Sequence, residues 1–299
     1  MSRSSNEVSK HNSERLILRG QTLFLSKPVV MGVLNVTPDS FSDGGKFNTI
    51  TVAVERIEEM QEEGATIIDI GGESTRPGAP AVSAEEEIDR VLPVLEQALG
   101  NFPNLFFSVD TTKFEVARRA LEAGAHIIND ISGLQKEPRL AGLCADFNAG
   151  YILMHSQGNP QTMQDNPTYN DVIADITTFF NDQLAVAADH GLTENIILDP
   201  GFGFGKTLNH NLTIATHLEK FLSLGFPILT GASRKSMIGT VLGNRNVEGR
   251  LFGTVAFHYD NLLKGAKIIR VHDVRAAADS VSIYNALHSY KFTITKSDT

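Results

Sequence analysis

Eight short apolar runs recur along the chain, and the segments between them carry hydrophobic residues at helical spacing. Alternation of this kind is built from βαβ units whose strands form a parallel sheet. Because eight units follow one another without a Pro-, Gly- or Ser-rich linker, they favour a closed barrel over an open sheet. The apolar runs are residues 28–34, 66–70, 105–109, 126–130, 150–154, 195–199, 227–231 and 267–271.

In five of the intervening segments, apolar residues recur every three or four positions, and several segments end on glycine, as helices do. These predicted helices are residues 51–64, 83–100, 115–124, 171–191 and 247–265. The chain of 299 residues also matches the size of one barrel domain. We therefore predict an α/β fold, a (β/α)8 TIM barrel, in which residues 16–295 form a single domain.

The chain ahead of the first run predicts one further element. Residues 16–25 (LILRGQTLFL) indicate two short strands around Arg19-Gly20, so we expect an N-terminal β-hairpin. Residues 1–15 are polar and lack the apolar stretch of a signal peptide, which indicates a disordered tail.

The charge balance and the cysteine count narrow the class of protein. There are 26 basic and 35 acidic side chains, and a net charge of −9 argues against nucleic acid and anionic membranes as partners. No apolar run approaches the ~20 residues of a membrane span. The single cysteine, Cys144, cannot form an internal disulfide, and its apolar neighbours predict a core position. A reducing, cytoplasmic setting is expected.

Polar residues follow nearly all of the apolar runs. In a (β/α)8 barrel the active site lies at the carboxyl ends of the strands, so these residues predict one crowded polar site at the barrel mouth. They are Asn35, Gly71–Ser74, Asp110, Asn129-Asp130, His155, Asp199, Ser233–Ser236, Arg270 and His272.

Five sequence blocks carry a resemblance to a known family. They are LNVTPDSFSDGG (34–45), DIGGESTRPGA (69–79), DPGFGFGK (199–206), GASRKSMIG (231–239) and RVHDV (270–274). In this order, from about residue 28 to 275, the chain resembles the dihydropteroate synthases. The resemblance implies a sulfonamide-target enzyme of folate biosynthesis. Its substrates would be (7,8-dihydropterin-6-yl)methyl diphosphate and 4-aminobenzoate, and its products 7,8-dihydropteroate and diphosphate.

Asp110, Asn129 and Asp199 each close an apolar run and should project into the barrel mouth. Two carboxylates and an amide are complementary to the hydrogen-bond donors of a pterin's pyrimidine edge. Taken singly, each is as readily a cap of a strand end or of the following helix, above all Asp110 beside Thr111-Thr112. The resemblance implies that all three bind the pterin and that Met154 packs on the pterin face.

Lys235 and Ser236 lie in a basic, hydroxyl-rich turn ahead of a helical pattern. Such a turn is typical of an anion site, because free N–H groups and the helix dipole attract negative charge. A solvated basic turn is the alternative. The resemblance implies that Lys235 reaches the pterin carbonyl and that Ser236 receives the aminobenzoate carboxylate.

Arg270 and His272 are two residues apart on a predicted strand and therefore share a face. An Arg–His pair suits a diphosphate, because arginine forks onto phosphate oxygens. A contact between His272 and Asp273 is the alternative. Asn35 can offer a neutral oxygen to Mg2+, which borrows its other ligands from water and phosphate. The resemblance gives Asn35 that role and makes Mg2+ the cofactor.

The catalytic residues would then be Asn35, Lys235, Arg270 and His272, with the C–O bond breaking before the amine attacks. This dissociative course is what the resemblance implies, whereas the residues alone permit direct displacement. No side chain stands out as a nucleophile.

Two stretches without periodicity, Val36–Phe47 and Gly71–Pro80, predict mobile loops, with ordinary surface turns as the alternative. The resemblance places four of their residues around the aminobenzoate and the diphosphate: Phe41, Asp43, Thr75 and Arg76, with an Asp43–Arg76 contact closing the site.

The run GFGFG (201–205) lacks the spacing of a nucleotide-binding loop. It predicts a tight turn that lets Phe204 approach a flat ligand. His155 has no assigned role, because no Cys or His lies at zinc spacing from it.

Two other functions remain open: a folate–corrinoid methyltransferase barrel and a non-catalytic pterin-binding protein. Neither needs the SRKS, STRPGA and RVH segments. Finally, helical segments 247–265 and 276–292 carry apolar residues on more than one side, among them Phe252, Phe257, Tyr259, Ile283 and Tyr284. A homodimer is expected, unless these helices simply cover one another.

Overall fold

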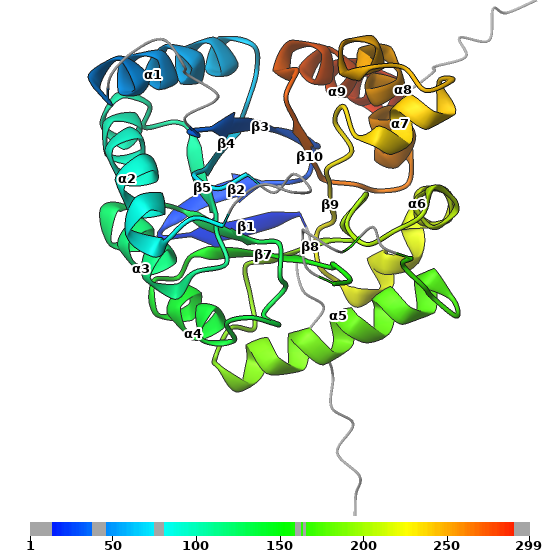
Figure 1. The fold of residues 1–299 in the computed structure, drawn as a ribbon, viewed down its shortest axis with the longest axis horizontal. Coiled ribbons are helices and arrows are strands. Elements are labelled where there is room, and N and C mark those ends of the chain that lie inside the picture. Colours follow the sequence, from blue (N-terminus) through cyan, green and yellow to red (C-terminus); the bar gives the residue numbers. More distant parts are fainter. Residues whose placement is uncertain (1–13, 38–45, 75–80, 159–162, 164–165, 290–299) are drawn as a thin grey trace, which may run out of the picture.

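The computed structural model describes residues 14–37, 46–74, 81–158, 163 and 166–289, and within them it forms a (β/α)8 barrel (Figure 1). Eight parallel strands lie in the order β8-β7-β6-β5-β4-β3-β10-β9. The sheet closes where Leu198 pairs with Ile228 and donates its N–H to the carbonyl of Pro227 at 2.9 Å. The eight strands are β3 (Val29–Asn35), β4 (Ile67–Gly71), β5 (Phe106–Asp110), β6 (Ile127–Asp130), β7 (Gly150–Met154), β8 (Ile196–Asp199), β9 (Leu229–Thr230) and β10 (Ile268–Val271).

Helices surround the strands on all sides in Figure 1. They are α1 (Lys46–Glu62), α2 (Ala84–Asn101), α3 (Phe114–Ala123), α4 (Arg139–Asp146), α5 (Val172–Asp189), α6 (Leu208–Thr216), α7 (Ser236–Val241), α8 (Leu251–Leu263) and α9 (Val274–Ser289), with 3-10 turns η2 (Leu218–Leu224) and η3 (Val247–Arg250). The predicted barrel is therefore confirmed. None of the helices in these described ranges is long and apolar enough to cross a membrane.

The helix boundaries correct the sequence prediction in two places. The predicted helix 247–265 is split, because Asn246 caps a 3-10 turn and α8 begins only at Leu251. Helix α1 begins at Lys46, inside the stretch predicted to be a loop. Elsewhere the caps are those that the sequence offers: Ser83 accepts the N–H of Glu86 ahead of α2, and Asp171 accepts from the first turn of α5.

The barrel interior has an apolar floor at its amino-terminal end. One inward-facing side chain from each strand contributes to it, and four leucines of the hairpin β1 (Arg15–Leu18) and β2 (Gln21–Phe24) and of the residue after it pack against them. The predicted hairpin is thus confirmed, and it closes this end of the barrel. The floor residues are Met31, Ile67, Phe106, Ile127, Ile152, Ile197, Leu229 and Ile268, with Leu16, Leu18, Leu23 and Leu25.

The strand residues next to the floor residues point to the outer face of the barrel, where they pack against the helices and form the second, larger core. Cys144 of α4 is fully buried there, as predicted, and burial raises the pKa of its thiol. Because both the amino-terminal end and the outer face are filled with apolar side chains, the carboxyl ends of the strands are the place left for a polar site.

Candidate active site

The two-residue period of the strands places the predicted polar residues directly above the apolar floor. The residues two positions after the floor residues form a lower polar layer, and the residues four positions after them form an upper layer. The lower layer holds Asp69, Ser108, Asn129, Met154, Asp199 and Arg270. The upper layer holds Asn35, Gly71, Asp110 and His272. Most of the residues predicted from sequence therefore share one end of the barrel interior.

Arg270 lies at the centre of this layer, between two carboxylates. Its Nε donates to Asp69 Oδ2 at 2.7 Å, its Nη2 forms an ion pair with the same oxygen at 2.6 Å, and Nη2 donates to Asp110 Oδ2 at 3.0 Å. Although burial lowers it, the nearby carboxylates of Asp69 and Asp110 raise the pKa of the guanidinium above its usual value. Arg270 therefore stays charged and joins strands β10, β4 and β5 across the barrel.

The carboxyl group of Asp110 has an unusual acidity. Burial, reinforced by the negative charge of Asp69, raises its pKa to about 7, and Arg270 only partly offsets this. Burial also raises the pKa of Asp199, whose Oδ1 accepts the N–H of Gly201 at 2.7 Å. Asp110 is thus poised to change its protonation state near neutral pH.

Lys235 belongs to the connection between β9 and α7, and its ammonium interacts electrostatically with Asp199, Arg270 and Asp110. Its Nζ donates to the carbonyl of Phe202 and lies 4.3 Å from the centre of the Phe204 ring, a cation–π contact. Burial lowers its pKa to about 8, and the charge of Asp199 opposes that shift. The ammonium and the two carboxylates of Asp110 and Asp199 therefore lie in one electrostatically coupled group.

The GFGFG run forms the tight turn that the sequence predicts. Gly201 and Gly205 have φ of 68° and 61°, in the left-handed region. A Cβ on Gly201 would lie 2.0 Å from the carbonyl oxygen of His155, and one on Gly205 would lie 2.3 Å from that of Gln157. Only glycine allows this close approach between the turn and the residues after β7, which places Phe204 beside Lys235.

His155 and Lys206 form a buried pair behind this turn, which the sequence did not indicate. Lys206 Nζ lies 2.9 Å from His155 Nδ1, 3.2 Å from the His155 carbonyl and 3.0 Å from the Phe204 carbonyl. Burial lowers the pKa of Lys206 well below its usual value and that of His155 to about 2. The imidazole of His155 is therefore neutral at neutral pH, and the hydrogen bonds of Lys206 to two backbone carbonyls hold the turn.

His272 meets Ser233 rather than Asp273. Its Nδ1 and its backbone N–H both lie 3.1 Å from Ser233 Oγ, and burial, with the charge of Arg270, lowers the pKa of the imidazole to about 4. Asp273 instead accepts two bonds from Arg234. The alternative reading of His272 as a partner of Asp273 is therefore wrong. Ser236 is exposed at the first residue of α7.

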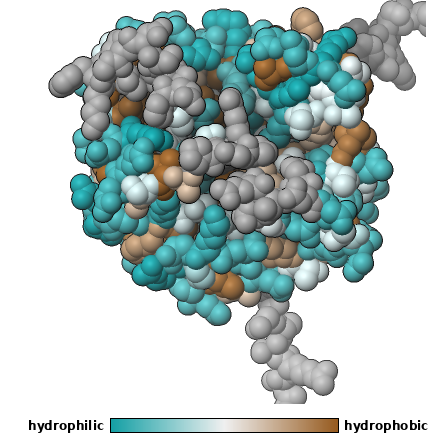
Figure 2. All heavy atoms as spheres, viewed as in Figure 1, coloured by the Kyte–Doolittle hydropathy of each residue, from teal (hydrophilic) through white to brown (hydrophobic). Residues whose placement is uncertain are grey.

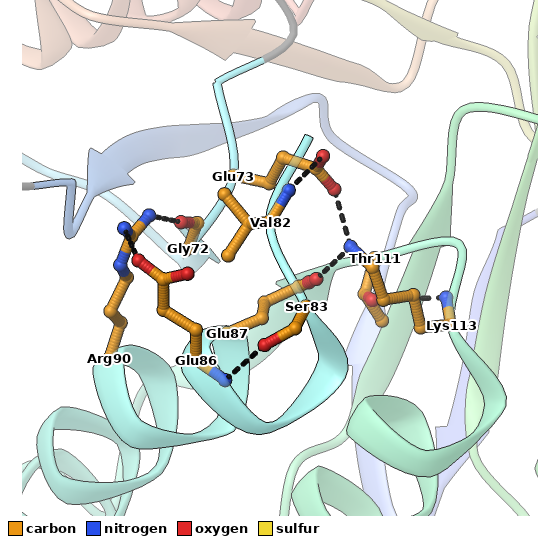
Figure 3. A network of polar contacts seen from close by, with 9 residues as sticks. All are labelled: Gly72, Glu73, Val82, Ser83, Glu86, Glu87, Arg90, Thr111 and Lys113. Carbon is orange, nitrogen blue, oxygen red and sulfur yellow. Dashed lines mark hydrogen bonds and ion pairs between the residues drawn. The ribbon is translucent and has the colours of Figure 1, made fainter. Parts of the chain in front are cut away.

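The base of the β4–α2 connection is tied to β5 by an ionic network (Figure 3). Lys113 Nζ lies 2.5 Å from both Glu73 Oε2 and Glu87 Oε2, and Glu87 is almost completely buried. Glu73 Oε1 accepts the N–H of Val82 at 3.2 Å. Glu73 and Val82 therefore bracket residues 74–81 from both ends. Arg90 of α2 adds a 2.8 Å bond to the Gly72 carbonyl.

Four predicted site residues, Phe41, Asp43, Thr75 and Arg76, lie outside the described residues, together with their predicted contact. Sequence reasoning missed Asp69 and Lys206, and it placed Ser233 at the barrel mouth without giving it a role. Asp69 had a signal in the sequence, because it is a charged residue inside an otherwise apolar run. In the structure its side chain is fully buried.

Comparisons with known proteins agree on one kind of protein. A family model described as pterin binding enzyme matches residues 31–272. The dihydropteroate synthase of Escherichia coli K12 is 48% identical over 278 residues, which cover 93% of this chain and 98% of that protein. The structure of Yersinia pestis dihydropteroate synthase with a sulfonamide drug complex has a TM-score of 0.86 at 46% identity, covering 92% of this chain and all of that one. Xanthomonas albilineans dihydropteroate synthase with 4-aminobenzoic acid has a TM-score of 0.87 at 43% identity, with coverage of 94% and 100%.

Proposed function

The chain belongs to the dihydropteroate synthase family of pterin-binding enzymes, and from this premise we propose how its residues carry out the reaction. The reaction transfers the (7,8-dihydropterin-6-yl)methyl group to the amine of 4-aminobenzoate and releases diphosphate. One observation carries the assignment of roles: hydrogen-bond acceptors and one ammonium face each other in a polar layer above a closed apolar floor.

The pterin ring would lie in this layer. Asp110, Asn129 and Asp199 supply acceptors for the ring N–H and amino groups of the pyrimidine edge. Lys235 supplies a donor for the ring carbonyl from the opposite side. Met154, which is 3% exposed at the end of β7, and the half-buried Phe204 ring supply apolar surface for the faces of the ring.

The diphosphate would lie above the pterin, towards Asn35, Arg270 and His272. Ser233 Oγ already accepts the backbone N–H of His272, so its own proton is free to go to Nδ1. The neutral imidazole then carries its proton on Nε2, where it can donate to a phosphate oxygen. Thr75 is also proposed for this subsite, from the family resemblance alone.

Mg2+ fits this site as a companion of the diphosphate. Within the described ranges, no group of three acidic, His or Cys side chains is placed to hold a metal by itself. Asn35 ends β3, and a Cβ on the neighbouring Gly71 would lie 3.6 Å from its Oδ1 and 3.7 Å from Asp110 Cβ, so the glycine keeps this space clear. Asn35 and phosphate oxygens would hold the ion, which would neutralise charge on the leaving group.

With the leaving group stabilised by Asn35, Arg270 and His272, the C–O bond breaks and its electron pair leaves with the diphosphate. The carboxylates of Asp110 and Asp199 offset the positive charge that develops on the pterin. The aminobenzoate amine then attacks the methylene carbon, the C–N bond forms, and the nitrogen gives up one proton to water. We place its carboxylate near Ser236, and its ring among Phe41, Asp43 and Arg76, on the family resemblance.

Incubation of the protein with the pterin diphosphate, Mg2+ and 4-aminobenzoate tests the function. Dihydropteroate and diphosphate should form together in equal amounts. Diphosphate release without dihydropteroate, or no turnover in the presence of Mg2+, would contradict the proposal. Asn35→Ala should raise the Mg2+ concentration needed for half-maximal rate, which separates the ion's role from that of the pterin pocket.

We infer a homodimer from the apolar side chains of helices α8 and α9. Phe252 and Leu263 lie eleven residues apart on one side of α8 and are 80% and 53% exposed, while Ile283 and Leu287 of α9 are 57% and 63% exposed. Figure 2 shows hydrophobic side chains among hydrophilic ones on this side of the barrel, over the α7–α9 corner. The alternative, that the helices cover one another, holds only in part: Phe257 packs on Phe202, and Tyr259 on Tyr284.

Light scattering over a dilution series tests the dimer. The wild-type mass should be about twice 32.5 kDa and should fall towards that value in Phe252→Asp. Phe24→Asp is a matched control, because Phe24 is 66% exposed on the hairpin away from these helices. A wild-type mass of one chain at every concentration would exclude the dimer.

A further inference from the structure

Asp69 is the most deeply buried charged group of the site, and the proposed mechanism does not use it. It lies on β4, two positions above the floor residue Ile67, and its exposed fraction is 0%. A ligand in the barrel mouth therefore meets the neighbours of Asp69 rather than Asp69 itself. A buried carboxylate is costly unless its partners compensate it, so its contacts indicate what it does.

Asp69 has two partners, and both belong to the proposed ligand site. Its Oδ2 accepts from Nε of Arg270 at 2.7 Å and from Nδ2 of Asn129 at 3.0 Å, and it forms an ion pair with Nη2 of Arg270 at 2.6 Å. Its Oδ1 has no hydrogen-bond partner in the described part of the chain. The side-chain contacts of this carboxylate among the described residues are therefore with Arg270 and Asn129, and they orient both groups.

The contact with Asn129 fixes the orientation of an amide. A carboxylate only accepts hydrogen bonds, so the amide must turn its nitrogen towards Asp69. The amide oxygen of Asn129 then points away from Asp69 and adds an acceptor to those of Asp110 and Asp199. Without the charge of Asp69, the amide could turn over and offer its NH2 group instead.

The contact with Arg270 fixes the position of a cation. Arg270 contacts Asp110 through a single 3.0 Å hydrogen bond, and it contacts Asp69 through a shorter hydrogen bond of 2.7 Å and an ion-pair contact of 2.6 Å. If Asp69 were neutral, Asp110 would be the one carboxylate left to hold the guanidinium. Asp110 would then be drawn away from its role as an acceptor for the pterin.

We propose that Asp69 is a positioning residue that sets the donor–acceptor pattern of the pterin pocket by holding Arg270 and by fixing the amide of Asn129. The proposal rests on the pterin pocket described above and adds its specificity. An array of acceptors selects a pterin, whose position 2 carries an amino donor. It discriminates against lumazine, in which an oxo group, an acceptor, stands at that position.

Calorimetry with 6-hydroxymethylpterin and with lumazine tests this on wild type, Asp69→Asn and Ser108→Ala. Ser108 is the matched control, because it is fully buried in the same layer of the next strand and its hydroxyl has no hydrogen-bond partner among the described residues. Wild type and Ser108→Ala should prefer pterin strongly. Asp69→Asn should lose about tenfold or more in pterin affinity and also lose much of the preference over lumazine.

A purely structural role for Asp69 would lower the melting temperature and leave the pterin-to-lumazine ratio at its wild-type value; that result would overturn the proposal. If wild type itself binds neither compound, the pterin pocket fails, which is a different outcome.

Asp69→Asn leaves the buried charge of Arg270 with a weaker partner, so the double variant Asp69→Asn/Arg270→Gln provides a second test that does not depend on the stability of the single variant. Because it contains neither charge of the pair, it should fold. Its kcat/KM should match that of Arg270→Gln alone if Asp69 acts largely through Arg270. A full additive loss would show that Asp69 acts independently and would refute this part of the proposal.

Discussion

Replacement of Lys113 by methionine should destabilise the barrel and weaken aminobenzoate binding together. The change removes the only cation that contacts the buried carboxylate of Glu87 among the described residues. A hydrogen bond to a charged group in such a place contributes ~1.5–3 kcal/mol, and the more exposed bond to Glu73 adds about 1 kcal/mol or less. The sum of about 3 kcal/mol corresponds to a fall of roughly 6 °C in the melting temperature of a domain of this size.

The pH range of the effect follows from the pKa of Lys113. Although partial burial lowers it, the hydrogen bonds to Glu73 and Glu87 raise the pKa above the usual 10.5. A cation with a raised pKa in the folded state contributes its stability below the unfolded value and loses it as the pH rises through the folded value. The difference between wild type and Lys113→Met should therefore be constant from pH 7 to 9 and shrink above pH 10.5.

Scanning calorimetry and aminobenzoate titrations in the presence of pyrophosphate and Mg2+ provide the measurements. Aminobenzoate affinity should fall because Glu73 and Val82 bracket the segment that carries Thr75 and Arg76. Arg118→Met is the control, because Arg118 also bridges two glutamates but lies on the exposed face of α3, so the melting temperature should barely move. The double variant Lys113→Met/Glu87→Met, with no buried charge left unpaired, should recover stability. A double variant no more stable than Lys113→Met would refute the reasoning.

Two further predictions concern the ligands. Pterin affinity should fall as the pH is lowered through about 7, because protonated Asp110 has one acceptor fewer, and Asp110→Asn should bind ~1.5–3 kcal/mol more weakly with little pH dependence below the pKa of Lys235, about 8; calorimetry from pH 5.5 to 7.5 measures both, and a pH-independent wild type would contradict the assignment. The charged groups that act on Asp110 are Asp69, Arg270, Glu87, Asp130 and Lys235. Aminobenzoate should bind poorly alone and well with pyrophosphate and Mg2+, and equal affinity in both conditions would exclude ordered binding.

The fold was predictable from sequence because its strands are buried on both faces. A strand buried on both faces appears as a continuous apolar run, and each of the eight strands overlaps one of the eight runs to within one residue at its carboxyl end. Helices α4 and α6 were not predicted, since they span only 8 and 9 residues, too few for a helical period to emerge. The helical pattern expected after Lys235 is α7, which spans 6 residues. Helix α9 lacks a clear boundary signal, because its first turn follows the last strand almost directly.

Which residues belong to the site was more predictable from sequence than which of their side chains contact one another. The strand ends identified which residues share the barrel mouth, because register and period 2 determine that from sequence. The partner of Arg270 could not be read in this way, because Arg270 pairs in register with Met31, whereas Asp69 pairs with Val33, two residues further along the same strand β3. The tilt of strands in a closed barrel brings such offset residues together, and no local pattern encodes it.

The same geometry explains how a chain of net charge −9 can bind two anionic substrates. The basic residues near the strand ends are not equivalent. Arg234 is neutralised by Asp273, and Lys206 is buried with its Nζ bonded to His155 and to the Phe204 carbonyl, so neither draws an anion into the mouth. Arg270 keeps its charge because Asp69 and Asp110 surround it, and Lys235 loses only part of its charge near pH 8. The positive charge of the site is therefore local and lies on Arg270, which we propose for the diphosphate, and on Lys235, which we propose for the pterin carbonyl. Since they face buried carboxylates, the site attracts an anion at its rim and stabilises a cation beneath it, which is the charge separation that breaking the C–O bond of a pterin diphosphate creates.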